Sequence, residues 1–345
     1  MKRKHESAGK QVSRTDRRKE LTEHIQKLLE ERGLETLKRV QEAIFEDEIE
    51  SKDICEALKH FLSYRHGFLV RPMLISLGCE AVGGKTDLVP DVATPLVLMS
   101  AGMDIHDDII DNQEKQESRR TVYGRFGQNV ALLAGDALLF KGLTKWHHLA
   151  EKLQPQAFVQ LTQMLNEAFF EVGDGEALEL AFAGRLDVKP ERYLAMVGKK
   201  AADIDLLLRV GAFLGHGTRE QVESLGKIGR SLGMLWVLSD DVNDIFDREE
   251  MKRRLNGGCV PLPLLYASRN EETKTKLRNT LKNRQIDKKD ARMVAEFVMK
   301  TDGLAVTKKK MKDLASNMMR EIEKLPVTEK LTLLAEASLD FISQV

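Results

Sequence analysis

The sequence predicts an all-α protein. Helical periodicity, in which apolar residues recur about every three or four positions, runs through long stretches of the chain, and alternating β-branched runs are few. Only eight prolines occur in 345 residues, so few positions exclude a helix. We find no convincing strand. The expected architecture is a large helical bundle with a central cavity, a fold in which metal sites are built from side chains of facing helices.

The same periodicity gives the individual elements. In the first half of the chain we expect helices over residues 21–46, 54–63, 71–81, 89–111 and 128–149. In the second half we expect them over residues 156–171, 175–183, 190–214, 219–246, 260–268, 288–299, 305–323 and 328–343. Glycine-rich segments support these divisions, because glycine favours helix C-caps, and they are Gly83-Gly84, Gly215-His216-Gly217 and Asn256-Gly257-Gly258.

The domain organisation is expected to be simple. Residues 1–20 are strongly charged, and we expect a disordered tail there. No linker rich in serine or proline divides residues 21–345, so we expect one helical domain.

The composition excludes several classes of partner and location. Lys plus Arg equals Asp plus Glu at 54 each, so the overall charge does not indicate a nucleic-acid-binding protein. Three cysteines, without a C-x-x-C pair, fit a reducing compartment. The N-terminal residues carry no apolar signal region, and no apolar run approaches the roughly 20 residues of a membrane-spanning helix. We therefore expect a cytoplasmic protein without a transmembrane segment.

Two copies of one acidic pattern are the main functional signal. They read Asp107-Asp108-Ile109-Ile110-Asp111 and Asp240-Asp241-Val242-Asn243-Asp244, each within an apolar stretch. On a helix, the first and third Asp of each copy project from the same face one turn apart. Like charges at this spacing repel each other, and desolvating them costs several kcal/mol per charge. A bound cation would offset that cost.

The ligand type indicates which cation. Six carboxylates offer oxygen ligands alone, and Mg²⁺ prefers oxygen, binds one or two carboxylates, and completes its coordination with water and substrate phosphate oxygens. The sequence thus predicts Mg²⁺ bound by two groups of carboxylates on opposite walls of the bundle, which would hold one diphosphate between them. The six expected metal ligands of the two motifs are Asp107, Asp108, Asp111, Asp240, Asp241 and Asp244.

The order and spacing of further motifs resemble the trans-isoprenyl diphosphate synthases, the family of farnesyl and geranylgeranyl diphosphate synthases. The resemblance spans roughly residues 65–267. Besides the two Asp motifs, its anchors are Arg71-Pro72, Glu80-Ala81-Val82-Gly83-Gly84, Phe126-Gly127, Leu133-Ala134-Gly135-Asp136, Lys200-Ala201, Leu232-Gly233 and Pro263-Leu264-Leu265.

The resemblance implies an isoprenoid-synthase-like helical bundle, usually a homodimer, with Mg²⁺ as cofactor. It implies condensation of an allylic diphosphate with isopentenyl diphosphate to give a longer all-trans prenyl diphosphate. Asp107, Asp108, Asp111 and Asp240 would carry the catalytic metal, and Lys200 would bind the diphosphate.

The half of the site that would hold isopentenyl diphosphate departs from the family pattern. The family lysine three residues before Arg71 is Phe68 here, and a family histidine is Ser100. The family arginine pair is displaced by three residues to Arg119-Arg120. Arg71 is retained, and His66, Arg119 and Arg120 are candidates to replace the missing phosphate contacts. The segment after Asp244 differs as well, and residues 248–258 carry Lys252, Arg253 and Arg254.

Several readings follow from these departures. Arg65, His66, Arg119 and Arg120 could complete the second substrate site, or a related subunit could complete it in a heteromer. A terpene cyclase would ionise an allylic diphosphate without isopentenyl diphosphate. A fourth reading, a metal-dependent phosphohydrolase built on His66, His106-Asp107 and Asp136, leaves the second Asp motif unexplained.

Product length is expected from the helix before the first Asp motif, because family members stop chain growth with bulky side chains there. Met99, Gly102 and Met103 occupy the relevant turns, and none is aromatic. We therefore expect a product longer than C15, either C20 or C25. Ordinary helix packing is the alternative explanation for Met99.

Overall fold

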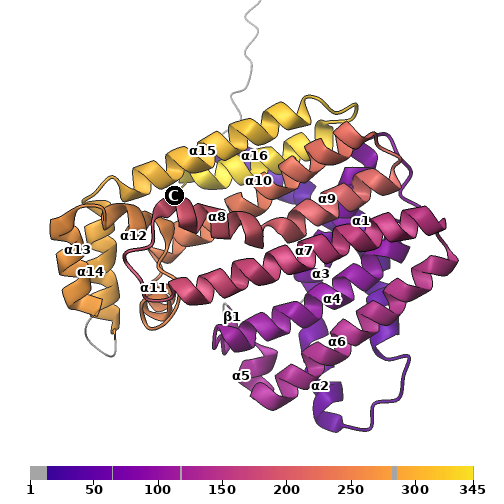
Figure 1. Ribbon diagram of the computed structural model, residues 1–345, viewed down its shortest axis with the longest axis horizontal. Coiled ribbons are helices and arrows are strands. Elements are labelled where there is room, and N and C mark those ends of the chain that lie inside the picture. Colours follow the sequence, from indigo (N-terminus) through magenta and orange to yellow (C-terminus); the bar gives the residue numbers. More distant parts are fainter. Residues whose placement is uncertain (1–13, 64, 117–118, 282–285, 345) are drawn as a thin grey trace, which may run out of the picture.

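The structure is a computed structural model that describes residues 14–63, 65–116, 119–281 and 286–344. Within these ranges the chain is almost entirely helical, as Figure 1 shows, and the predicted all-α fold class is confirmed. None of the described helices is both long and apolar enough to cross a membrane.

The elements follow one another with short connections. In the first half they are α1 (Arg14–Ile44), α2 (Lys52–Leu62), α3 (Arg65–Ala81), α4 (Val89–Ile110), β1 (Lys115–Gln116), β2 (Arg119–Arg120), α5 (Val122–Phe126), α6 (Gln128–His148) and the 3-10 turn η1 (Leu149–Glu151). In the second half they are α7 (Pro155–Phe182), α8 (Pro190–Lys200), α9 (Ala202–Leu214), α10 (Arg219–Asp244), α11 (Arg248–Leu255), α12 (Leu262–Ala267), α13 (Glu271–Leu281), α14 (Lys288–Met299), α15 (Gly303–Ile322) and α16 (Glu329–Gln344).

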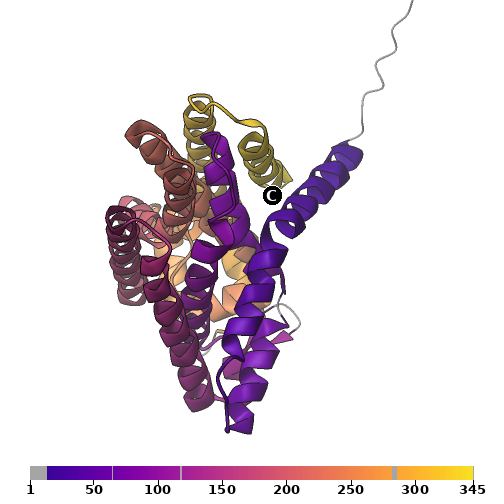
Figure 2. The same ribbon diagram turned by 90° about the vertical axis from the view of Figure 1, so that its right-hand side faces the viewer.

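The long helices pack along one another around a continuous apolar core. Helix α4 packs along α6, α9 packs between α3 and α10, and α15 covers α10. Helices α11 to α14 gather at one end of the molecule, on the left of Figure 1. In Figure 2 the N-terminal part of α1 projects away from the other helices.

Several element boundaries differ from the sequence predictions. Residues 156–171 and 175–183 form the single helix α7, whereas residues 190–214 divide at Ala201 into α8 and α9. Helices α5, α11 and α13 were not predicted. The prediction of no strand was wrong in one place, because Lys115 and Gln116 pair antiparallel with Arg120 and Arg119 in a minimal hairpin.

The expected charged tail falls mainly outside the described residues, but α1 already begins at Arg14. The division into a tail of residues 1–20 and a domain of residues 21–345 stays a prediction.

The two Asp motifs lie at the C-terminal ends of two long helices. Helix α4 ends at Ile110 with Asp111 as its C-cap, and Asn112 then adopts a left-handed conformation with φ of 51°. Helix α10 ends at Asp244. The C-terminal end of a helix carries partial negative charge, so it destabilises nearby carboxylates and favours cations. At both helix ends, therefore, nearby positive charge would stabilise the carboxylates of the Asp motif.

Candidate active site

The first Asp motif is partly buried, and only its third carboxylate, Asp111, has an ion pair among the described residues, with Arg253. Asp107 and Asp108 are half-buried, and within the described part of the chain neither carboxylate forms a side-chain hydrogen bond or ion pair. Desolvation raises the pKa of Asp107 to about 7, and Glu176 adds to the shift. Desolvation followed by the charge of Asp104 raises the pKa of Asp108 to about 7 as well. Two carboxylates with raised pKa values at a helix C-terminus are a favourable place for a cation.

The second Asp motif has a different environment at each carboxylate. Asp240 is exposed, and among the described residues it has no ion-pair partner. Asp241 is fully buried, where its Oδ1 accepts a hydrogen bond of 2.9 Å from the Tyr193 hydroxyl and its Oδ2 accepts one of 3.1 Å from the Leu262 amide. Asp244 accepts a hydrogen bond of 2.9 Å from Arg254 Nε and forms an ion pair of 2.8 Å with Arg254 Nη2.

The pKa values of this second group are also raised. Desolvation, assisted by the charge of Asp244, raises the pKa of Asp240 to about 6. Desolvation raises that of Asp241 to about 6, although Arg254, the Leu262 amide and Tyr193 all act in the opposite direction. The cost of desolvating the carboxylates of Asp241 and Asp244 is thus offset by their contacts with Arg254, Tyr193 and the Leu262 amide. Asp240 has no such contact among the described residues.

Lys200 lies close to the first group. It is the last residue of α8, and its Nζ forms ion pairs with Glu179 and, at 3.1 Å, with Glu176 of α7. Burial would lower the pKa of Lys200, but the charges of Glu179 and Glu176 outweigh this and raise it, so the lysine is charged. Asp107 and Glu176 in turn influence each other's charge. A cationic group therefore stands beside the first motif.

A glycine on α7 makes this approach possible. A Cβ atom at Gly175 would lie 2.9 Å from the Lys200 backbone nitrogen, so a larger residue would push α8 away. From the sequence we expected a break here, between helices over residues 156–171 and 175–183. In the structure the helix continues, and the glycine allows close contact instead.

Two consecutive arginines of α11 connect the motifs. Arg253 Nη1 lies 3.5 Å from Asp111 Oδ2 of the first motif, and Arg254 pairs with Asp241 and Asp244 of the second. Since both contacts come from one short helix, the two Asp motifs, which are far apart in sequence, lie at the same site. That the two motifs together hold Mg²⁺ and a diphosphate stays a prediction.

A cavity of about 520 Å³ adjoins the first motif. It lies between α2, α3, α4 and the hairpin, and its walls are formed by Phe61, Ser63, Gly67, Phe68, Arg71, Ala101, Asp104, Asp107, Asp108, Gln113, Gln116, Arg119, Thr121 and Val122. Asp107 and Asp108 therefore belong both to the first Asp motif, which is the proposed cation site, and to the wall of this cavity.

Arg71 is in this cavity, but it is paired internally. Its guanidinium forms hydrogen bonds of 2.9 and 3.2 Å to the two carboxylate oxygens of Asp104, and the charge of Asp203 adds to the field around it. Phe68, at the position of the family lysine, is buried and packs edge-on against Phe61 with ring centroids 5.4 Å apart. This wall is apolar where the family pattern has a cation.

The other candidate phosphate ligands are distributed unevenly. Arg119 lines the cavity, and its Nη1 lies 3.4 Å from the Ser63 carbonyl oxygen. Arg120 is absent from the cavity wall, and its Nη1 lies 3.5 Å from the Gly124 carbonyl oxygen. His66 belongs to α3, but its side chain lies outside the described residues.

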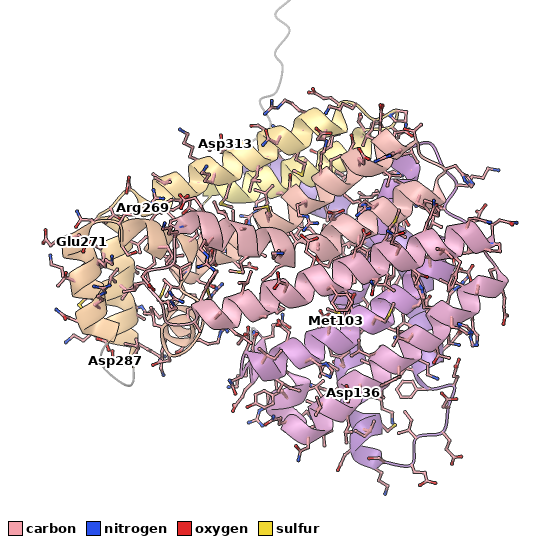
Figure 3. All side chains as sticks on the ribbon, viewed as in Figure 1. Met103, Asp136, Arg269, Glu271, Asp287 and Asp313 are labelled. Atoms are coloured by element: carbon pink, nitrogen blue, oxygen red, sulfur yellow. The ribbon has the colours of Figure 1, made fainter. Side chains whose placement is uncertain are left out.

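The three residues proposed to limit product length face different surroundings. Met99 is buried against Gly142 of α6, where a Cβ atom would lie 2.5 Å from Met99 Cγ. A Cβ atom at Gly102 would lie 2.6 Å from the Gly135 carbonyl oxygen of α6. Both positions serve the close packing of α4 on α6. Met103, labelled in Figure 3, is half-buried and does not line the cavity described above, so its part in product length stays a prediction.

At the first motif, Asp107 and Asp108 offer carboxylate oxygens without internal partners in the described chain, and oxygen is the ligand type that Mg²⁺ prefers. The three carboxylates of this motif do not themselves form a group with metal-binding geometry, so the fit rests on the ligand type. At the second motif the fit is partial, because Asp240 is available while Asp241 and Asp244 already bind Arg254.

The hydrolase ligand set does not assemble within the described residues. His106 Nε2 lies 3.4 Å from Oδ1 of Asp136, which belongs to α6 and is labelled in Figure 3. No group of three or more His, Cys, Asp or Glu with metal-binding geometry occurs in the part of the chain that the structure describes.

Sequence reasoning missed several members of the site. Glu176, Glu179 and Tyr193 were not singled out, and Asp104 was not recognised as the partner of Arg71. The spacing of Glu176 and Glu179, three residues apart on a helix, was a usable signal, since such residues share a face. Tyr193 carried no such signal, because its role depends on a contact with Asp241, 48 residues away.

A model of the polyprenyl synthetase family matches residues 51–298. Among curated proteins, the short chain isoprenyl diphosphate synthase of Methanothermobacter thermautotrophicus is 30% identical over 213 residues, which cover 61% of this chain and 64% of the relative. The match thus spans less than two thirds of that relative's length. The geranylgeranyl diphosphate synthase of Saccharolobus solfataricus is 26% identical over 291 residues, which cover 81% of this chain and 85% of that protein.

Among solved structures, the geranylgeranyl pyrophosphate synthetase of Pyrococcus horikoshii superposes with a TM-score of 0.81. The alignment covers 94% of this chain and 99% of that one at 23% identity. At that identity the likeness concerns the fold, and it extends over nearly the whole of both chains.

Proposed function

This chain belongs to the polyprenyl synthetase family, and from that premise we propose that it is a Mg²⁺-dependent prenyltransferase. It condenses an allylic diphosphate with isopentenyl diphosphate and releases a longer all-trans prenyl diphosphate. The family resemblance found in the sequence is confirmed by the match over residues 51–298, and the helical fold is that of the family's solved structures.

The observation that carries the proposal is the meeting of two carboxylate groups beside a cavity. Asp107, Asp108 and Asp111 end α4, Asp240 ends α10, and Arg253 and Arg254 connect them. A diphosphate carries several negative charges, so it can lie among carboxylates only if cations are placed between them. Bound Mg²⁺ would supply that charge and would stabilise the developing pyrophosphate anion.

The chain's own residues perform the remaining tasks. Asp107, Asp108, Asp111 and Asp240 would hold the cation, and Lys200 would stabilise negative charge on the departing group. The apolar wall formed by Phe61 and Phe68 keeps water from the allylic carbon when its bond to oxygen breaks. The new carbon–carbon bond forms at the double bond of isopentenyl diphosphate, and a proton is lost to the departing pyrophosphate.

For the second diphosphate we propose Arg71 and Arg119, which face the same cavity. Binding requires Arg71 to exchange Asp104 for a phosphate oxygen or to contact both. Arg120 and His66 remain proposed contributors. The loss of the family lysine at Phe68 removes one cation, so this half of the site depends more strongly on the two remaining arginines.

We propose a C20 or C25 product. Met103 is flexible and not aromatic, so it leaves room below the first Asp motif that a phenylalanine would fill. Because Met99 and Gly102 pack against α6, we propose Met103 as the residue of the three that limits product length.

We also propose that the chain acts as a homodimer. Helices α6 and α7 expose a set of large apolar side chains that comprises Leu132, Leu133, Phe140, Leu143, Val159, Phe169, Phe170 and Leu180. A monomer rarely leaves so many on neighbouring helices, and a second subunit would cover them. A related but different subunit is the alternative occupant. The three cysteines are unpaired, which supports a cytoplasmic location.

The test is an assay of the purified chain alone with Mg²⁺, radiolabelled isopentenyl diphosphate and dimethylallyl, geranyl or farnesyl diphosphate. The products are hydrolysed and sized by reversed-phase chromatography. We expect incorporation of label into C20 or C25 products that stops when a chelator removes Mg²⁺.

Two other outcomes would redirect the proposal. Without incorporation, addition of a related subunit that restores it would identify a heteromer. Release of pyrophosphate and formation of a hydrocarbon or alcohol, without label, would identify a terpene cyclase.

A further inference from the structure

The segment after the second Asp motif also departs from the family pattern, and in the proposed function its two arginines serve only to connect the two motifs. Helix α11 begins after Asp247, whose carboxylate caps the amides of Glu249 and Glu250 at 2.8 and 3.1 Å. It carries Arg253 and Arg254 in its last turn. These two neighbours have very different environments.

Arg254 is almost completely buried, and its donors are matched to acceptors. Nε donates a hydrogen bond of 2.9 Å to Asp244 Oδ2, and Nη2 forms an ion pair with the same oxygen at 2.8 Å. Nη2 also lies 3.3 Å from Asp241 Oδ1, and Nη1 lies 3.4 Å from the Cys259 carbonyl oxygen. Glu179 is 4.0 Å away. An arginine keeps its charge in proteins, and such charge-assisted contacts are among the strong hydrogen bonds.

Asp241 has no room for a hydrated cation. It is fully buried, its Oδ1 is occupied by Tyr193 and Arg254, and its Oδ2 is occupied by the Leu262 amide. Mg²⁺ in proteins usually keeps several waters, and it needs carboxylate oxygens that reach solvent or substrate. Asp240, on the neighbouring position of the helix, is exposed and meets this requirement.

We propose that Arg254 is the resident cation of the second Asp motif. It neutralises Asp241 and Asp244 permanently, so that the motif contributes Asp240 alone to the divalent cation. Arg254 is a positioning residue in this role, because it fixes the end of α10 from which Asp240 projects. This inference rests on the proposed function, in which a divalent cation and a diphosphate bind between the motifs.

The experiment measures Mn²⁺, as a paramagnetic probe, bound to the full-length chain in the presence of inorganic pyrophosphate. Free Mn²⁺ is counted by electron paramagnetic resonance. Asp240→Asn and Asp241→Asn form a matched pair of adjacent, isosteric changes. Because loss of a group that merely orients a metal ligand costs roughly 10- to 100-fold in affinity, loss of a ligand should cost at least about tenfold. We expect that loss for Asp240→Asn and an affinity near that of the wild type for Asp241→Asn.

Arg254→Gln provides the complementary change, since it releases Asp244 and Asp241 for metal. We expect it to bind more Mn²⁺ per chain than the wild type, and we expect Arg254→Lys, which retains the charge, to bind the wild-type number. If Arg254→Gln does not fold, the pair of aspartate variants still decides the question.

Two results would overturn the inference. One is a loss of Mn²⁺ affinity in Asp241→Asn as large as in Asp240→Asn, and the other is unchanged Mn²⁺ binding in folded Arg254→Gln. Failure of the proposed function gives a different result, because Asp107→Asn and Asp240→Asn would then both bind Mn²⁺ as the wild type does.

Discussion

The two Asp motifs have the same sequence pattern and the same place at the end of a long helix, but opposite electrostatic surroundings. At the first motif, Asp107 and Asp108 are half-buried without an internal ion pair among the described residues, and their pKa values rise to about 7. At the second, Arg254, Tyr193 and a backbone amide compensate Asp241 and Asp244.

The difference shows that a repeated motif does not imply a repeated site. At the first motif only Asp111 has an ion pair among the described residues, with Arg253, whereas at the second motif Arg254 pairs with both Asp241 and Asp244. Substitutions at the first motif should therefore act mainly on activity, and substitutions around the second should act largely on stability.

The largest effect is expected at the first motif. In the proposed function Asp107 helps to hold the cation next to the departing pyrophosphate, so Asp107→Ala should lose one principal charge-stabilising group, which costs about 100- to 1,000-fold in turnover. Steady-state kinetics with an allylic diphosphate measure the change. Asp136→Asn, on α6 outside both motifs, is the control and should retain turnover. Equal rates for Asp107→Ala and the wild type would remove the first motif from the site.

A second prediction concerns stability at the second motif. Arg254→Met leaves Asp241 buried without its cation, and breaking a buried ion pair from one side costs about 3–5 kcal/mol. Arg253→Met breaks a partly exposed pair with Asp111, which contributes at most about 1 kcal/mol. Urea unfolding of the two neighbours compares these values. Similar losses in both variants would contradict the contrast between the motifs.

The third prediction sharpens the role of the cavity. Arg71→Gln removes a charged donor to the second diphosphate, and a charged hydrogen bond contributes about 1.5–3 kcal/mol, or roughly 10- to 150-fold. We expect this factor in the KM for isopentenyl diphosphate, with little change in the KM for the allylic substrate. Arg120→Gln should change KM less, because Arg120 is absent from the cavity wall. The reverse order of the two variants would reassign the second site.

The fourth prediction is a pH dependence of the metal-free chain. Asp107 and Asp108 have folded-state pKa values near 7, above the usual value of 3.8, so the folded state binds more protons than the unfolded state between these values. Their contribution to stability is present below about pH 4 and is lost as the pH rises through 7. The melting temperature should therefore fall from pH 5 to pH 8.

The matched measurement is the double variant Asp107→Asn/Asp108→Asn, whose melting temperature should fall less over the same range. Added Mg²⁺ should also reduce the dependence in the wild type. A double variant that follows the wild-type profile would place the titrating groups elsewhere.

The smallest effect is expected at Met103. Met103→Phe adds an aromatic ring below the first Asp motif and should shorten the main product by one isoprene unit. Met103→Leu, which nearly conserves volume, should leave the product distribution unchanged. An unaltered distribution in Met103→Phe would exclude this residue from the cavity floor.

Much of the fold was predictable because the helices depend on local signals. Helix α4 was expected over residues 89–111 and ends at Ile110, and α10 was expected to begin at Arg219, as it does. The continuity of α7 could not be predicted, because glycine disfavours helices locally and Gly175 is accommodated by its contact with Lys200. The short helix α11 was missed because its apolar pattern is too brief to distinguish from a loop.

The carboxylates of the candidate site were identifiable from the sequence, but the cations that pair with them were not. Asp107 and Asp240 were identifiable from repeated acidic residues in apolar surroundings. The pairing of Arg71 with Asp104 and of Arg254 with Asp244 depends on rotamers and helix placement. The family resemblance implied a catalytic role for Asp240 and not for Asp241, but the burial of Asp241 was not predictable, since it depends on Tyr193 of α8 and on the Leu262 amide.

The most direct test of the contrast between the two motifs is a crystal structure of the chain with Mn²⁺ and inorganic pyrophosphate, in which anomalous scattering locates the metal. We expect Mn²⁺ at Asp107 and at Asp240, with Arg254 still paired with Asp241 and Asp244. Mn²⁺ bound to Asp241 or Asp244, with Arg254 displaced, would contradict the account.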